Sequence, residues 1–150
     1  MPVKAIPEAY HTVTPYLVVE DGSRLIEFMK QAFGGKASEE FRSPDGRLMH
    51  AEVRIGDSCV MVGEPMPGHP AMPAMLYLYV KDVDATYQSA IRAGATSEME
   101  PVNQFYGDRS GGVKDPCGNK WWLATHVEDV APDEMKRRAE AAMKQRHGAA

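Results

Sequence analysis

The sequence has little of what marks several classes of protein. It contains only two cysteines, Cys59 and Cys117, without the spacing of a disulfide framework or a zinc finger, so free thiols are expected. No apolar run approaches the ~20 residues of a membrane-spanning helix, and no charged-then-apolar leader opens the chain. Acidic residues (21) outnumber lysine and arginine (17), so there is no basic field for nucleic acid. These absences predict a cytoplasmic protein that acts on a small molecule or another protein, with neither nucleic acid nor membrane as a partner.

An internal duplication is the main feature that is present. When the chain is laid over itself with a shift of 61 residues, similar residues coincide at three places: Val19-Glu20-Asp21 on Val80-Lys81-Asp82, Gly46 on Gly107, and Val60-Met61-Val62 on Trp121-Trp122-Leu123. The length of 150 residues is typical of one domain with a real core. We therefore expect a single domain, residues 1–150, built from two similar modules.

The first module covers about residues 10–63. Residues 12–19 are rich in β-branched and aromatic types and predict a strand. Asp21 or Ser23 can cap the helix that follows, and Gly34 can end it in a left-handed conformation. Three more strands are predicted, at residues 37–42, 48–55 and 58–62.

The second module covers about residues 75–128 and repeats this order. A strand at residues 75–80 leads to a helix capped by Asp82, and a weaker strand follows at residues 96–102. Asp115-Pro116-Cys117-Gly118 has the residue preferences of a type I turn inside a hairpin. Each module thus has the element order βαβββ.

Two segments lie outside the repeat. Residues 64–74 carry four prolines and predict an extended linker without ladder hydrogen bonds. Residues 132–146 begin with proline and acidic residues and predict a C-terminal helix. The fold class is therefore α+β, with two βαβββ modules forming curved mixed sheets around a cleft, plus a C-terminal helix.

Alternation along the strands sorts side chains onto two faces. The apolar set should lie under the helices: Leu17, Val19, Val60, Val62, Leu76, Leu78, Val80, Trp121 and Leu123. The opposite set mixes aromatic and polar types: Thr14, Tyr16, Val18, His50, Glu52, Arg54, Cys59, Met61, Met75, Tyr77, Tyr79, Lys120 and Trp122. Such a mixture predicts a small-molecule cleft. The alternative is that its aromatic residues fill a second core or a dimer interface.

Three polar features remain open in the sequence. His50 and Glu52 could form a pair for proton transfer or hold one metal ion, although such a pair is more often a solvated rim. The loop at residues 103–111 carries Phe105, Tyr106 and Arg109, which could contact a ligand or form a structural turn. Cys59 is expected to be a buried, inert thiol.

Several motifs together resemble a known family: Ala32-Phe33-Gly34, His50-Ala51-Glu52, the segment from Asn103 to Arg109, and Asp115-Pro116-x-Gly118-x-x-Trp121 through Ala124-Thr125-His126. With the βαβββ duplication, they resemble the glyoxalase/bleomycin resistance protein/dioxygenase superfamily, also called the vicinal oxygen chelate fold, and best its PhnB-like branch. The resemblance covers about residues 10–130. It implies paired sheets enclosing a cleft, usually in a homodimer, used for ligand sequestration or metal-assisted chemistry.

The resemblance also places the family's metal ligands, which lie on the first and last strand of each module. In this sequence the matching positions are Thr14, Met61, Met75 and Trp122. None of the four is a usual ligand for a hard or borderline divalent ion. We therefore expect the usual metal site to be absent and predict no cofactor.

Three functions follow from these observations. The first is a metal-free binding protein whose ligand contacts Tyr16, Met61, Tyr77, Tyr79, Phe105, Tyr106, Arg109 and Trp122, with Arg109 or Glu52 pairing with the ligand's charge. The second is a lyase, isomerase or dioxygenase with a divalent metal at a displaced site near His50 and Glu52, which are then the catalytic candidates. The third is a non-catalytic dimeric interaction protein.

Overall fold

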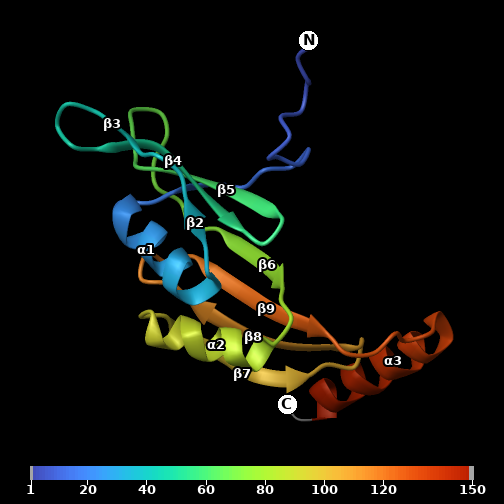
Figure 1. The fold of residues 1–150 in the computed structure, drawn as a ribbon. Helices are drawn as coiled ribbons and strands as arrows, with labels where there is room; N and C mark the ends of the chain where they lie inside the picture. Colours follow the sequence, from blue (N-terminus) through green and yellow to red (C-terminus); the bar gives the residue numbers. More distant parts are fainter. Residues whose placement is uncertain (1, 149–150) are drawn as a thin grey trace.

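The computed structural model describes residues 2–148 and has the predicted α+β architecture (Figure 1). The first sheet has the order β1-β5-β4-β2, with β3 also paired to β4; its strands are β1 (Tyr16–Val18), β2 (Lys36–Ala37), β3 (Phe41–Arg42), β4 (Leu48–Ile55) and β5 (Ser58–Gly63). The second sheet has the order β6-β9-β8-β7; its strands are β6 (Met75–Tyr79), β7 (Thr96–Asn103), β8 (Asp108–Lys114) and β9 (Lys120–His126). The helices are α1 (Gly22–Phe33), α2 (Val83–Arg92) and α3 (Pro132–Gly148).

The two sheets repeat one topology. In each, the first strand of the module runs parallel to the last, β1 beside β5 and β6 beside β9. The residue pairs also correspond, because Tyr16 lies opposite Met61 and Tyr77 lies opposite Trp122. The shift of 61 residues converts one pair into the other, so the duplication seen in the sequence is a duplication of structure.

The first two helices begin where the sequence predicts, and α1 also ends there. Asp21 caps α1 by accepting a hydrogen bond from the backbone N–H of Arg24 at 3.1 Å, and Gly34 ends it at φ 66°. Asp82 caps α2 in the same way, at 3.1 Å from the N–H of Ala85. Both helices therefore have fixed starts close to the first strand of their modules.

The helix-side faces of both sheets share one core. Leu17, Val62, Trp121 and Leu123 are buried, as the alternation predicts, and the apolar stripe of α1 packs on them. The rings of Phe33 and Trp121 lie 4.9 Å apart, so the end of α1 contacts the last strand of the other module. Burial of this continuous apolar surface holds the two modules together.

Local details differ from the sequence prediction. The strand predicted at residues 12–19 begins only at Tyr16, because Pro15 has no N–H to donate to a ladder. The strand predicted at residues 37–42 is two short strands, because Ser38 turns to bond Glu52 through both backbone and side chain. The linker was predicted to lack ladder bonds, which is wrong at Met72, whose N–H donates to Val18 at 3.2 Å.

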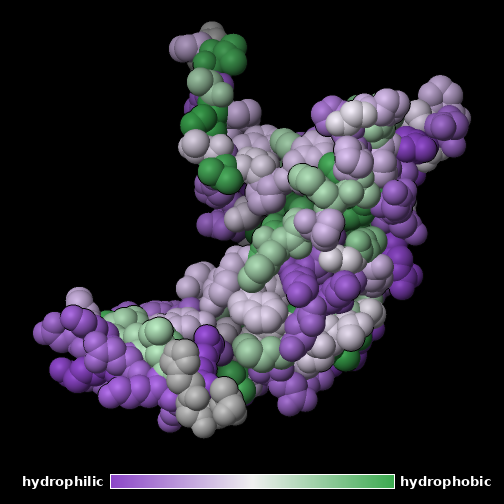
Figure 2. All heavy atoms as spheres, turned by 180° about the vertical axis from the view of Figure 1, so that it is seen from behind, coloured by the Kyte–Doolittle hydropathy of each residue, from purple (hydrophilic) through white to green (hydrophobic). Residues whose placement is uncertain are grey.

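The C-terminal helix extends away from the two sheets (Figure 1). Within residues 2–148, Arg138 attaches α3 to the body by donating to the carbonyl of Phe105 at 3.2 Å and to Glu128 at 2.7 Å. No helix in this part of the chain is both long and apolar enough to cross a membrane. We call residues 2–15, which precede β1, the N-terminal arm. The surface of the molecule is hollowed between this arm and α3 (Figure 2).

Candidate ligand-binding site

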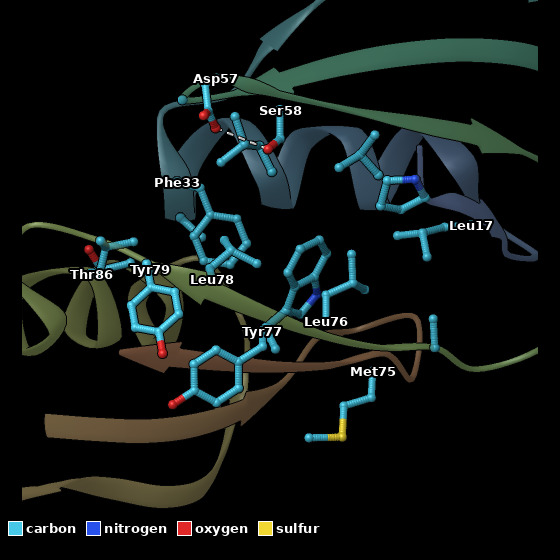
Figure 3. Close-up of a pocket in the computed structure, with 18 of the residues that line it drawn as sticks. Leu17, Phe33, Asp57, Ser58, Met75, Leu76, Tyr77, Leu78, Tyr79 and Thr86 are labelled. Atoms are coloured by element: carbon cyan, nitrogen blue, oxygen red, sulfur yellow. Dashed lines mark hydrogen bonds between the residues drawn. The ribbon is translucent and has the colours of Figure 1, made fainter. Parts of the chain in front are cut away.

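A cleft of about 1330 Å³ runs along β6, between the two sheets (Figure 3). Since β6 is an edge strand, one side of it is not covered by a neighbouring strand of its sheet. Leu78 points towards Phe33 and Leu76 lies nearer to Leu17, while Asp57 and Ser58 lie across the cleft from β6. The cleft therefore follows a strand edge, whereas the sequence predicted it over a sheet face.

The aromatic side chains of β6 lie at this cleft and remain accessible. Tyr77 is 41% exposed, Tyr79 is 66% exposed, and their rings lie 5.3 Å apart. Met75 precedes them on the same side of the strand, and Tyr16 lines the cleft from β1. Four of the predicted cleft-face residues are thus brought together at one opening.

A buried carboxylate holds these tyrosines in place. Asp108, only 4% exposed, accepts hydrogen bonds from Tyr79 at 2.9 Å and from Tyr77 at 3.3 Å. Its second oxygen pairs with Nδ1 of His126 at 2.8 Å. Burial raises the pKa of Asp108, but the bonds from His126, Tyr79 and Tyr77 outweigh it and leave the pKa below its ordinary value. We call Tyr77, Tyr79, Asp108 and His126 the sheet-2 cluster.

His126 lies between two carboxylates. Besides Asp108 at Nδ1, its Nε2 lies 2.7 Å from Asp129. A carboxylate only accepts hydrogen bonds, so both ring nitrogens must carry protons and the side chain is an imidazolium. The bond to Asp108 and then the bond to Asp129 raise the pKa of His126 above its ordinary value. The sheet-2 cluster therefore presents a positive group at the end of the cleft.

We expect the pKa of His126 to lie above about 6.5 in an NMR titration of the folded protein. Asp108→Asn should lower it more than Asp129→Asn, because Asp108 is the larger cause. Since the pKa is raised on folding, the stabilisation from this charge is present below the ordinary value and is lost as pH rises through the folded value. A His126 resonance that titrates below 6.5 would contradict the assigned contacts.

A second polar cluster lies on the first sheet. Glu52 accepts hydrogen bonds from Tyr10 and from His50, the latter at 2.9 Å, and Tyr16 lies 3.4 Å from the other nitrogen of His50. Tyr10 and then His50 lower the pKa of Glu52, and the bond to Glu52 raises the pKa of Tyr10 to about 12. We call Tyr10, Tyr16, His50 and Glu52 the sheet-1 cluster. Only Tyr16 of this cluster lines the cleft.

The residues at the family's metal positions do not form a donor set for a divalent ion. Thr14 donates its hydroxyl to the carbonyl of His11 at 3.1 Å, and Met61 and Met75 offer only thioether sulfur. The indole of Trp122 lies directly over Gly112. Within residues 2–148, no group of three or more His, Cys, Asp or Glu side chains is placed to hold a metal ion.

The structure places Arg109 and Phe105 outside the lining of the cleft. Tyr106 lies beside Tyr77, and burial and then Tyr106 raise the pKa of Tyr77. Arg109 binds Asp84 on α2 through two nitrogens, at 2.8 and 2.9 Å, on the helix side of the second sheet. Phe105 and Tyr106 lie on the loop before β8 with their rings edge-to-face at 5.2 Å. Burial and then Glu52 raise the pKa of the Cys59 thiol, which is the state expected of an unreactive cysteine.

Tyr10, Asp108 and His126 are the polar residues that sequence reasoning did not select for a site. Asp108 is two strand positions from Ser110 and on the cleft side, so alternation along β8 could have revealed it. His126 follows from the same alternation, two residues beyond Ala124. Tyr10 carries no such signal, because it precedes the first strand and reaches Glu52 only through the folded chain.

Fold and site together define an α+β protein with duplicated βαβββ modules and an open cleft lined by aromatic residues. The family model of the glyoxalase/bleomycin resistance protein/dioxygenase superfamily matches residues 10–123. The chain belongs to this superfamily.

Known proteins are similar to this chain in sequence or in fold. An uncharacterized protein of Mycobacterium bovis is 37% identical over 135 residues, covering 83% of this chain and 89% of its own. TioX from Micromonospora sp. ML1 has a similar structure, with a TM-score of 0.65 and 22% identity over 78% of this chain and 99% of its own. The structure of a gene product of Arabidopsis thaliana is also similar, with a TM-score of 0.61 and 25% identity, and the match covers 77% of this chain and 98% of that protein.

Proposed function

We propose that the protein binds a planar or apolar small molecule in the cleft along β6, without the family's usual metal. The observation that carries the proposal is the pair of exposed phenol rings, Tyr77 and Tyr79, held by hydrogen bonds to the buried Asp108. Rings that are fixed before the ligand arrives lose little conformational entropy on binding. Exposed aromatic surface at a cleft with a few fixed polar groups is typical of ligand sites.

Other predicted ligand residues have different parts in this proposal. Tyr16 faces the ligand from the opposite wall, since it lines the same cleft. Met61 and Trp122 pair with Tyr16 and Tyr77 on neighbouring strands and support them from the side. Arg109 takes a structural part, because its guanidinium is engaged by Asp84.

Titration of Trp fluorescence with a set of aromatic ligands tests the proposal. At least one ligand should give saturable binding, and the double variant Tyr77→Ala/Tyr79→Ala should weaken it by at least about tenfold, because two stacking surfaces are lost. The double variant to phenylalanine keeps the rings and should retain most of the affinity. Phe41→Ala removes an exposed ring outside the cleft and serves as the control.

The absence of saturable binding by any member of the set would count against the proposal. So would equal affinity in the alanine double variant and the wild type, provided that circular dichroism shows the same fold for both.

A second candidate is metal-dependent chemistry at the sheet-1 cluster. The contact between His50 and Glu52 favours it, because imidazole and carboxylate are ligands for zinc, manganese and iron. Metal analysis of protein purified without chelator distinguishes the two functions. Stoichiometric metal that is lost in His50→Ala would support this candidate, and a preparation that takes up no added ion would exclude it.

We further propose that the protein forms a homodimer. A homodimer is also what the third function, a non-catalytic dimeric interaction protein, requires. Support comes from α3, which extends away from the sheets and leaves Met143 exposed, so that a further surface would bury this side chain. The hollow between the N-terminal arm and α3 offers room for a second copy (Figure 2). Sedimentation velocity should give twice the mass of 16.5 kDa, and a monomer at micromolar concentration would contradict this.

Two narrower assignments are also proposals. We place the chain in the PhnB-like branch on its Asn103–Arg109 and Asp115–Trp121 motifs. A cytoplasmic location is supported by the two cysteines, which are both free thiols.

A further inference from the structure

Almost all hydrogen-bond donors of the sheet-2 cluster bond to the carboxylate of Asp108, which belongs to the same cluster. The hydroxyls of Tyr77 and Tyr79 donate to Asp108, and Nδ1 of His126 donates to the same carboxylate. The remaining donor is Nε2 of His126, on a side chain that is 51% exposed and lines the cleft. A ligand that lies on the tyrosine rings therefore meets one donor that can change its partner.

The present partner of that donor is weakly held. Asp129 follows β9 in the connection to α3, and its side chain is fully exposed. An ion pair at such an exposed position contributes little to stability, because water competes for both charges. The carboxylate of Asp129 can leave Nε2 without disturbing the buried contact between Nδ1 of His126 and Asp108.

We propose that the ligand carries a carboxylate or a comparable oxyanion, which binds Nε2 of His126 in the place that Asp129 occupies. This inference rests on the function proposed above and names the class of ligand. The planar part of the ligand lies against Tyr77 and Tyr79, and Asp129 acts as an internal competitor for the imidazolium.

The surroundings favour an anion at this end of the cleft. Lys81 lines the cleft beside Thr125 and His126, directly after β6. Asp57, a carboxylate at the cleft, lies on the opposite wall in the hairpin between β4 and β5. Because Asp108 is buried behind the tyrosines and already bonded to three donors, its charge is largely compensated. An oxyanion that displaces Asp129 therefore replaces one carboxylate by another on Nε2 of His126, with Lys81 as a further cation at this end of the cleft.

Three matched probes test the inference: 2-naphthoate, the neutral 2-naphthamide, and the cationic 2-naphthylmethylamine. Calorimetric titration at pH 6 favours the protonated form of His126, whose pKa is raised by Asp108 first and then Asp129, while the carboxyl group of the probe stays ionised. We expect 2-naphthoate to bind about tenfold more tightly than 2-naphthamide, since a hydrogen bond between charged groups is added.

Variants separate the roles of the two side chains. His126→Gln should remove the preference for 2-naphthoate over 2-naphthamide. Asp129→Asn should tighten binding of 2-naphthoate by about threefold to tenfold and leave 2-naphthamide unchanged, because the internal competitor is gone. Asp133→Asn removes the same charge from the exposed start of α3 and should have no effect.

The outcomes distinguish this inference from the proposed function. If the probes bind with equal affinity, if the amine binds best, or if Asp129→Asn leaves binding of 2-naphthoate unchanged, the inference is overturned while binding along β6 stands. If none of the three probes binds while another aromatic ligand of the set does, the inference is overturned and the proposed function stands.

Discussion

Asp115→Ala is expected to lower the free energy of unfolding by about 3–5 kcal/mol, as for loss of a buried charged partner. The carboxylate of Asp115, 4% exposed, accepts four hydrogen bonds in the turn between β8 and β9. The donors are the backbone N–H groups of Cys117 and Asn119 at 2.8 and 3.0 Å, and the side chains of Asn119 and Trp121 at 3.0 and 2.8 Å. Alanine leaves these donors without their acceptor in the core. Urea unfolding followed by circular dichroism measures the change.

Two further variants sharpen this test. Asp115→Asn keeps an oxygen for the backbone donors but cannot accept from both side chains, so an intermediate loss is expected. Asp133→Ala, an exposed aspartate, should cost less than about 1 kcal/mol. A loss below 1 kcal/mol in Asp115→Ala would show that the turn does not depend on this carboxylate. The turn also holds the start of β6, because Asn119 accepts from the N–H of Ala74 at 3.0 Å.

Gly112→Ala is expected to destabilise the protein by about 1–3 kcal/mol and to move the indole of Trp122. A Cβ atom at Gly112 would lie 1.8 Å from Cζ3 of Trp122, and two more ring carbons would lie within 2.5 Å. The ring lies across the strand and has to leave it, which changes the surface next to Tyr77. Unfolding by urea gives the energy, and the Trp emission spectrum reports the new environment.

A double-mutant cycle identifies the cause of this loss. In a Trp122→Ala background the indole is gone, so Gly112→Ala should then cost little. If the cost of Gly112→Ala is the same in both backgrounds, the close approach of Gly112 and Trp122 is not its origin.

The sequence was sufficient for much of the fold because local signals agreed with the tertiary structure. Asp21 and Asp82 are strong N-caps, and the helices begin beside them. Alternation placed Trp121 in the core and left Tyr77 exposed, since the side-chain period of a strand is two. The duplication then placed corresponding strands in corresponding positions of each sheet.

The site was harder to predict because its contacts join residues that are distant in sequence. Asp108 bonds Tyr77 and Tyr79 across 31 and 29 residues, and Tyr10 bonds Glu52 across 42. No periodicity within one element reports such pairs. Arg109 was predicted to contact a ligand because its loop has the composition of a ligand-binding loop. Nothing in that loop indicates the ion pair that Arg109 forms with Asp84. Strand alternation gives the face of a residue, and the partner depends on how the strands and the helix of one module are brought together.

The most direct measurement is a map of backbone amide shifts during titration of the intact protein with 2-naphthoate. The account predicts that the largest saturable shifts lie along β6, at Asp108 on β8, and at His126 on β9. Shifts confined to His50, Glu52 and their neighbours on β4, or no saturable shifts at all, would contradict a ligand site on the second sheet.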